Sequence, residues 1–402
     1  MKYNIFALFI IFFIHFSCVR KQKDSYYDIA STIENSNLHI IDLDKAERID
    51  TCKLSFFFKS AKCVRLDDDS KAIIGGISKL VAYNGKLYVS DTKDAKSLIV
   101  FDDDGKYIMK IGERGRGPGE YVRFDDFTIN TDENEIILLD YGRIHIYDLN
   151  GKFLKTVQLQ QVDGNITTLQ YYDSLIYTDI HSYQKKDDDC LLQSVRIVDG
   201  QRKNRFLNTN EHNKGWNELL VNNMNYFVPK LDPPHLFRHS FMDTIFAITN
   251  IGLIPHLVIR SKEMITEKDL VLPPNTSPMI FLTLLSQKDK IYNIYSYFET
   301  PEIIHFRYNI GRKVYSVFYN KSKKTTQVAS SFNNDFVYKG RKSITTRFIF
   351  FNHKGAYEYI SYTVLDYLLP LIRDNQLKQP FNDQLKNLNE ESNPIIFYYE
   401  FK

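Results

Sequence analysis

The chain has 402 residues, 43% of them hydrophobic and 14% aromatic, and its 52 Lys and Arg nearly cancel its 49 Asp and Glu to leave a net charge of +3. A balance this close, without a sustained basic stripe interleaved with aromatic residues, gives no support for nucleic acid as a partner. The 27 Tyr and 29 Phe favour β-structure, because flat rings pack well on a pleated sheet.

The N-terminus is a predicted targeting segment. An almost wholly apolar run, Ile5–Phe16, is short for a membrane span and typical of a signal peptide. It is followed by a small residue and Cys18 in an arrangement that resembles a lipobox, although His15 stands where Leu is usual. We therefore predict a signal peptide over residues 1–17, lipidation of Cys18, and a polar tether over residues 18–37. The alternative is an ordinary cleaved signal with an incidental cysteine.

Two hairpin-like units, at residues 98–111 and 144–157, share the same turn chemistry. In each, β-branched and aromatic residues flank a turn rich in Asp, Asn and Gly, which favours a β-hairpin. The turn glycines Gly105 and Gly151 are 46 positions apart, and Gly200 follows 49 positions later. A repeat of this length, with several short strands per unit, is typical of a β-propeller blade.

The other strands are predicted from runs of β-branched and aromatic residues bounded by turn residues. In chain order they fall at residues 38–41, 54–58, 61–66, 77–89, 135–140, 173–179, 239–248, 255–259, 291–298, 303–308, 314–319, 348–351, 357–360 and 395–399. The range 77–89 holds two strands about Asn84-Gly85, a dipeptide that favours a type I′ turn. Pairing of the last strand with a blade begun at the other end of the chain would close the ring.

Three segments depart from this strand pattern. Residues 201–235 are rich in Asn, and we expect a long loop between blades. Residues 270–287 could hold a short helix. Residues 365–388 have helical spacing of apolar residues, but Pro370 and Pro380 limit them to two short helices.

A glycine-rich loop, Gly112–Tyr121, joins the two hairpin units and carries Arg114, Arg116 and Glu120. One interpretation is a ligand-facing rim, in which glycines let the backbone approach a ligand and the arginines bind a carboxylate or phosphate. The other, which we favour, is a structural crossover with the Arg and Glu side chains paired to each other. The loop is neither a Walker loop nor a dinucleotide fingerprint, because no Gly-Lys-Ser/Thr follows and its context is strand–loop–strand.

Candidate metal ligands are few, and we predict neither a metal nor another cofactor. His235 and His239 are four positions apart, but Pro233-Pro234 precede them and strands follow, so their side chains would not converge. The run 102–105 resembles a calcium loop but lacks the EF-hand order, which favours a solvated turn. No nucleophile elbow and no His-Glu-x-x-His motif occurs in the sequence.

If Cys18 is acylated, three cysteines remain: Cys52, Cys63 and Cys190. Cys52 and Cys63 could form a disulfide if they lie on adjacent strands, and the alternative is three buried thiols.

Four segments carry a resemblance to a known family: the Gly112–Tyr121 loop, Phe241–Phe246 followed by Pro255, Asn333–Asp335, and Asn393-Pro394. The chain resembles uncharacterised six-bladed β-propeller lipoproteins of Gram-negative envelopes, related in fold to TolB-like and NHL-repeat propellers. The resemblance implies an all-β fold over residues 38–402, with four-stranded antiparallel blades and minor helical insertions. The count of six rests on the resemblance, since the length would allow seven blades if loops did not take the excess. No established activity is implied.

We expect a lipid-anchored envelope propeller that acts as a binding or scaffolding module for a glycan, a peptide or a partner protein. The alternative is a hydrolase or lyase with its site in the central channel. Converging ionisable groups in the channel would favour the enzyme, and an aromatic mouth would favour binding. We expect a monomer held at the outer membrane, because Val19 gives no inner-membrane retention cue, and the membrane face is left open.

Overall fold

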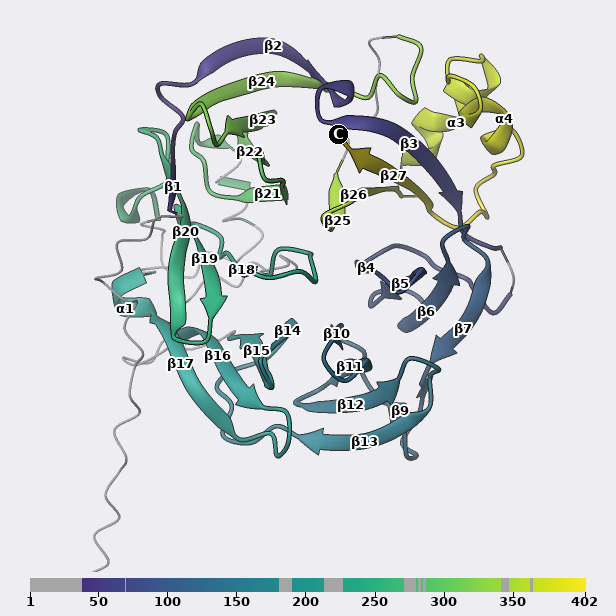
Figure 1. Cartoon of the computed structure of the whole chain (residues 1–402), viewed down its shortest axis with the longest axis vertical. Coiled ribbons are helices and arrows are strands. Elements are labelled where there is room, and N and C mark those ends of the chain that lie inside the picture. The colour runs from purple at the N-terminus through teal and green to yellow at the C-terminus, as the bar shows by residue number, and fades with distance from the viewer. Residues whose placement is uncertain are drawn as a thin grey trace, which may run out of the picture.

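The computed structural model describes residues 38–68, 70–180, 190–212, 227–270, 280, 283–284, 287–340, 347–361 and 364–402. The predicted signal peptide, Cys18 and the tether lie outside the described residues. Within them, six β-sheets surround a central axis as the blades of a propeller (Figure 1). Five of these sheets have four strands and one has five, so the predicted six-bladed, all-β fold is confirmed.

Blades 1 to 3 are each built from four consecutive antiparallel strands. Blade 1 contains β4 (Lys79–Tyr83), β5 (Lys86–Asp91), β6 (Ser97–Asp102) and β7 (Tyr107–Ile111). Blade 2 contains β10 (Asp126–Asn130), β11 (Glu135–Asp140), β12 (Arg143–Asp148) and β13 (Phe153–Gln158). Blade 3 contains β14 (Leu169–Tyr172), β15 (Leu175–Asp179), β16 (Cys190–Arg196) and β17 (Arg202–Asn208). Between blades 1 and 2, β8 (Glu113–Arg114) and β9 (Glu120–Tyr121) form a short parallel pair.

Blades 4 to 6 combine strands from both ends of the chain. Blade 4 contains β18 (His235–Phe237), β19 (Thr244–Thr249), β20 (Gly252–Arg260) and β1 (His39–Asp42). Blade 5 contains β21 (Ile294–Glu299), β22 (Ile303–Ile310), β23 (Lys313–Asn320), β24 (Thr325–Asn333) and β2 (Glu47–Lys53). Blade 6 contains β25 (Phe348–Phe351), β26 (Gly355–Ile360), β27 (Ile395–Phe401) and β3 (Phe58–Arg65).

The first three strands therefore form a belt around the outside of three successive blades, drawn in purple in Figure 1. β1 and β2 lie parallel to the strands they join, whereas β3 is antiparallel to β27. Pairing of β27 with β3 confirms the predicted closure of the ring by strands from opposite ends of the chain. Closure removes the open sheet edges that a linear array would expose.

Two of the sequence predictions about strands are wrong. The segment expected to be a loop from residue 201 begins with β17, whose polar and basic residues hid the strand although Arg205, Phe206 and Leu207 are buried. The strand expected at 54–58 is instead a 3-10 turn, η1 (Leu54–Phe56), and the strand beside it is β2, which was not predicted.

Helices are few among the described residues. Besides η1 they are α1 (Thr209–His212), η2 (Glu267–Leu270), α3 (Leu365–Arg373) and α4 (Phe381–Leu385). Residues 280, 283–284 and 287 are also helical, and most of the segment in which a short helix was predicted, 270–287, lies outside the described residues. Helices α3 and α4 confirm the prediction of two short helices, with Pro370 inside the first and Pro380 at the N-cap of the second. None of the helices in this part of the chain combines the length and the apolar character that a membrane crossing needs.

The repeated turn glycines have a packing role. Gly105 has φ of +90°, and a Cβ there would lie 2.1 Å from the backbone oxygen of Arg65, at the end of β3. Gly200, with φ of +72°, stands in the same relation to the backbone oxygen of Gln158, at the end of β13. In blades 1 and 3 the turn before the outer strand thus rests on the end of the outer strand of the preceding blade, where only glycine fits, whereas a Cβ at Gly151 would first meet the Ile111 side chain at 3.3 Å.

Candidate functional site

A cavity of about 640 Å³ lies between blades 6 and 1 and reaches toward the axis of the propeller. Its walls come from β3, from the β4–β5, β6–β7, β10–β11 and β25–β26 turns, and from the segment 231–233 that precedes β18. We call it the inter-blade groove. Because successive hairpin turns of a blade alternate between its two ends, these four turns share one face of the propeller.

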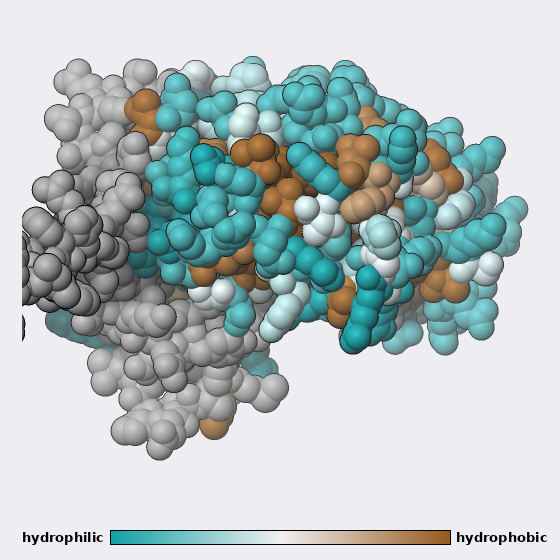
Figure 2. Space-filling view, turned by 90° about the horizontal axis from the view of Figure 1, so that it is seen from below, coloured by the Kyte–Doolittle hydropathy of each residue, from teal (hydrophilic) through white to brown (hydrophobic). Residues whose placement is uncertain are grey.

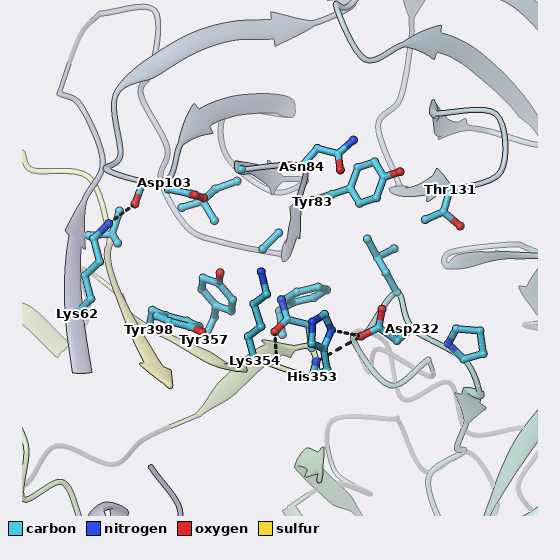
Figure 3. Close-up of a pocket in the computed structure, with 18 residues that line it drawn as sticks. Lys62, Tyr83, Asn84, Asp103, Thr131, Asp232, His353, Lys354, Tyr357 and Tyr398 are labelled. Atoms are coloured by element: carbon cyan, nitrogen blue, oxygen red, sulfur yellow. Dashed lines mark hydrogen bonds and ion pairs between the residues drawn. The ribbon is translucent and has the colours of Figure 1, made fainter. Parts of the chain in front are cut away.

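Four Phe and Tyr side chains are among the residues that line the groove, and Figure 3 labels three of them, Tyr83, Tyr357 and Tyr398. Tyr357 and Tyr398 are cross-strand neighbours on β26 and β27, with ring centroids 4.8 Å apart. Phe350 lies 5.8 Å from Tyr357, and Tyr83 approaches from blade 1 with its hydroxyl donating to Asn134 Oδ1 at 2.7 Å. Burial raises the pKa of both Tyr357 and Tyr398 above the ordinary tyrosine value. Their hydroxyl groups are protonated at neutral pH, as in any tyrosine, and can donate hydrogen bonds.

Charged side chains stand at both ends of the groove. At the outer end, Lys62 Nζ donates to Asp104 Oδ1 at 2.7 Å. At the axial end, Asp232 Oδ2 lies 3.3 Å from His353 Nδ1. The Lys354 ammonium extends into the space between them, and no ion pair to it occurs among the described residues (Figure 3). The backbone N–H of Lys354 is held by Asn352 Oδ1 at 2.9 Å, so the base of this side chain is fixed.

A second pair of ionisable groups lies in the channel, at the opposite end of the innermost strands. Lys79 Nζ is 3.1 Å from Asp126 Oδ2 and donates to the backbone oxygen of Phe127 at 2.7 Å. The same Asp126 oxygen accepts the backbone N–H of Leu169 at 2.9 Å. Both side chains are buried, and their polar atoms are used within the protein. This pair therefore joins the inner strands of blades 1, 2 and 3 rather than facing a substrate.

Three further buried carboxylates, which sequence reasoning did not single out, are also structural. They end the second strands of blades 1 to 3 and are almost completely enclosed. Each accepts backbone N–H groups from the segment leading into its own blade: Asp91 from Gly75 (2.8 Å), Asp140 from Arg123 (2.8 Å) and Asp179 from Thr168 (2.7 Å). A carboxylate held by several N–H donors stabilises a loop and is not free to act on a ligand.

The glycine-rich loop lies away from the groove, and none of its residues lines the cavity. Glu120 Oε2 accepts the backbone N–H of Gly117 at 2.7 Å, and the Tyr147 hydroxyl donates to the backbone oxygen of Gly119 at 2.8 Å. Arg114 and Arg116 are exposed and form no ion pair with Glu120 or any other described residue. The expected Arg–Glu pairing is therefore wrong, and backbone contacts and glycine geometry hold the crossover. Ligand binding by this loop stays a prediction.

The candidate metal ligands are not brought together. His235 is buried edge-on to Tyr172, with ring centroids 5.5 Å apart, whereas His239 Nδ1 bonds the backbone oxygen of Ser240. Among the residues that the structure describes, no group of three or more His, Cys, Asp or Glu side chains is placed to hold a metal ion. The run 102–105 is a turn in which Asp102 Oδ1 accepts the N–H groups of Asp104 and Lys106.

The three described cysteines are free. Cys52 lies on β2 in blade 5 and Cys63 on β3 in blade 6, so the disulfide considered for them is wrong: the two strands belong to different sheets. Cys52 and Cys190 are buried, and Cys63 is half-buried. The expectation of buried thiols therefore holds for two of the three.

The outer rim offers no comparable site in the view that Figure 2 gives. Seen from below the view of Figure 1, hydrophilic side chains separate several small apolar patches. The exposed apolar residues Ile108, Leu154 and Val198 belong to three different blades. Single exposed apolar side chains are ordinary on a protein surface and mark no interface.

Comparison with known proteins identifies the family. The sequence profile of a domain of unknown function, DUF4934, matches residues 38–400. The chain belongs to the DUF4934 family. No curated protein shows a significant sequence match to this DUF4934 chain.

Two solved structures share the fold. A Bacteroides fragilis NCTC 9343 protein assigned as exported is similar over 91% of this chain and 99% of its own, with 16% identity and a TM-score of 0.73. A DUF4221 family member from Bacteroides vulgatus is similar over 86% of this chain and 97% of its own, with 10% identity and a TM-score of 0.51. At these identities the likeness to the DUF4934 chain is one of fold.

Sequence reasoning did not find the groove of this DUF4934 propeller. Asn84-Gly85 and the turn at 102–105 were predicted as turns, and Tyr357 and Tyr398 fall in predicted strands, but no local pattern marked them as neighbours. Their convergence depends on which blades meet when the ring closes.

Proposed function

We propose that this DUF4934 propeller is a binding module that holds a carbohydrate in the inter-blade groove. The observation that carries the proposal is the set of partly exposed aromatic rings of Tyr83, Tyr357 and Tyr398, beside donors and acceptors on one face of the propeller. The C–H faces of sugar rings pack on aromatic rings, and their hydroxyl groups need the polar partners that such a mixed surface supplies.

We also propose that the chain acts in the cell envelope as a lipid-anchored monomer. The apolar run before Cys18 and the export assigned to the Bacteroides fragilis neighbour support this location. The lipobox-like sequence supports attachment through Cys18, and Val19, which gives no inner-membrane retention cue, supports the outer membrane. A relation in fold to TolB-like and NHL-repeat propellers is part of the same proposal.

A glycan array probed with the full chain tests the binding role. Replacement of Tyr398 by Ala removes one ring of the cross-strand pair, and we expect affinity for the glycans that bind to fall at least about tenfold, as at other aromatic contact residues. Tyr367→Ala is the matched control, because Tyr367 is 73% exposed on α3 and lies outside the groove. Binding that is unchanged in Tyr398→Ala, or absent across the array, would contradict the proposal.

One observation favours the alternative of a hydrolase or lyase. His353 and Asp232 lie 3.3 Å apart in the same groove, and an imidazole beside a carboxylate can move a proton. Incubation of the array-positive glycans with the protein, followed by mass spectrometry, distinguishes the two: cleavage that is lost in His353→Gln supports the enzyme, and intact glycans support binding.

A further inference from the structure

Some of the charged side chains that line the inter-blade groove are matched within the protein. Lys62 Nζ donates to the backbone oxygen of Asp103 at 2.9 Å and to Asp104 Oδ1 at 2.7 Å. Asp232 Oδ2 accepts the backbone N–H of His353 at 3.3 Å and lies 3.3 Å from its Nδ1. The Lys62 and Asp232 charges are therefore compensated before any ligand arrives.

The other two charges of the groove, those of Lys354 and Asp103, are not matched in this way. No hydrogen bond or ion pair joins the Lys354 ammonium or the Asp103 carboxylate to any described residue, and Asp103 serves Lys62 through its backbone oxygen only. The hydroxyl groups of Tyr357 and Tyr398 also lack a partner in this part of the chain. The groove thus holds a cation, an anion and two hydroxyl groups that are available to a ligand.

These groups belong to one site. Figure 3 shows the Lys354 side chain pointing into the groove, and Tyr357 and Tyr398 lie with their ring centroids 4.8 Å apart. Besides burial, the negative charge of Asp103 contributes to the raised pKa of both tyrosines, so its carboxylate is within electrostatic reach of their hydroxyl groups. A ligand that covers the two rings can therefore meet Asp103 as well.

We propose that the groove binds a glycan that contains uronic acid, with a sugar carboxylate on Lys354 and sugar hydroxyl groups on Asp103 and the two tyrosines. The inference rests on the proposed carbohydrate binding and names the class of sugar. A carboxylate supplies the opposite charge that Lys354 lacks, in a charge-assisted hydrogen bond. Asp103 accepts hydrogen bonds from hydroxyl groups and repels an acid, so it favours the hydroxyl edge of the sugar over its carboxylate.

The experiment measures binding of galacturonan, mannuronan and glucuronan oligosaccharides, and of their methyl esters, to the full chain. Esterification removes the sugar charge and keeps the ring configuration. In at least one series we expect the acid to bind about fivefold more tightly than its ester at low ionic strength, as for a partly exposed ion pair. Added salt should reduce this difference, because it screens the charges.

Variants separate the two roles. Lys354→Met should remove the preference for the acid and leave ester binding unchanged, whereas Lys354→Arg should keep the preference. Asp103→Ala should weaken binding of both acid and ester, and it retains the backbone oxygen to which Lys62 donates. Lys106→Met is the matched control, because Lys106 is exposed in the neighbouring β6–β7 turn and does not line the groove.

An acid that binds no more tightly than its ester in any of the three series would overturn the inference, and neutral glycans that still bind would leave the proposed function standing. A preference that persists in Lys354→Met, or that Lys106→Met removes equally, would also overturn it. Ester binding that is unchanged in Asp103→Ala would overturn the placement of hydroxyl groups on Asp103. If no glycan of any kind binds, the proposed function fails and the inference fails with it.

Discussion

Glu358 on β26 carries a carboxyl group enclosed between blades 5 and 6. The residue is 2% exposed, and its Oε2 accepts the Tyr399 hydroxyl at 2.7 Å. Asn334 Nδ2 in turn donates to the Tyr399 oxygen at 2.6 Å. Burial raises the pKa of Glu358 to about 8, although the hydrogen bond from Tyr399 and the charge of Arg307 act in the opposite direction. The group is therefore neutral in the folded protein at pH values where it would be ionised in the unfolded chain.

We predict that Glu358→Gln flattens the loss of stability that the wild-type protein shows as pH rises from about 4.5 to about 8. Because the folded pKa is raised from 4.5 to about 8, this group's contribution to stability is full below pH 4.5 and is lost as pH rises through 8. Gln stays neutral and can still accept the Tyr399 hydrogen bond. Urea unfolding should show the variant gaining on the order of 3 kcal/mol relative to wild type between pH 5 and pH 9.

Glu400→Gln is the control for this prediction, because the Glu400 side chain is only half-buried and the pKa of its carboxyl is lowered by Lys59 and Ser60. It should show no such relative gain. A difference between Glu358→Gln and wild type that does not change with pH would contradict the enclosed, neutral carboxyl.

At the scale of elements, the crossover from blade 1 to blade 2 depends on glycine geometry. Gly119 has φ of +75°, and a Cβ there would lie 2.8 Å from the Cβ of Phe153, at the start of β13. Its backbone oxygen accepts the Tyr147 hydroxyl. The parallel pairing of β8 with β9 and the contact of Glu120 with the Gly117 N–H complete a loop that the backbone itself holds.

We predict that Gly119→Ala lowers the free energy of unfolding by about 2 kcal/mol, since it combines a left-handed backbone with a steric conflict. Arg114→Ala and Arg116→Ala should change it by less than about 0.5 kcal/mol, because both side chains are exposed and unpaired among the described residues. Denaturant midpoints measure all three. Arginine variants as unstable as the glycine variant would mean that side-chain pairing, not backbone geometry, holds the loop.

At the scale of the whole molecule, closure joins the last strand to the start of blade 1. Asn393 precedes β27, and its Nδ2 donates to the backbone oxygens of Asp67 at 2.6 Å and Ala72 at 2.8 Å. Its Oδ1 accepts the backbone N–H of Ile74 at 2.9 Å. One side chain thus satisfies three backbone groups of the segment that links β3 to β4.

We predict that Asn393→Ala lowers the free energy of unfolding by about 3 kcal/mol, because it leaves buried backbone groups without partners. Asn389→Ala, in the exposed turn just before, removes only local bonds to Glu391 and Ser392 and should cost about 1 kcal/mol or less. Unfolding monitored by circular dichroism compares the two. Equal losses would show that Asn393 has no special part in closure.

The sequence by itself determined the repeating unit of this protein. The hairpins were predicted correctly from turn residues with positive φ, such as Asn84 and Gly85, because turn sterics act within a few residues. The blades were predicted correctly from the repeat of the turn glycines Gly105, Gly151 and Gly200. The two short helices around Pro370 and Pro380 were predicted from the helical spacing of apolar residues and from the restriction that proline places on a helix interior.

Only the tertiary structure decided how the ends of the chain join and where the groove lies. β2 pairs with β24 across some 280 positions, and its exposed, polar sequence carries no alternating pattern because an outermost strand faces water. The groove brings together residues from Lys62 to Tyr398 that lie on several turns and strands far apart in the chain. Which blade edges meet is settled by closure of the ring, a long-range event that short stretches of sequence do not record.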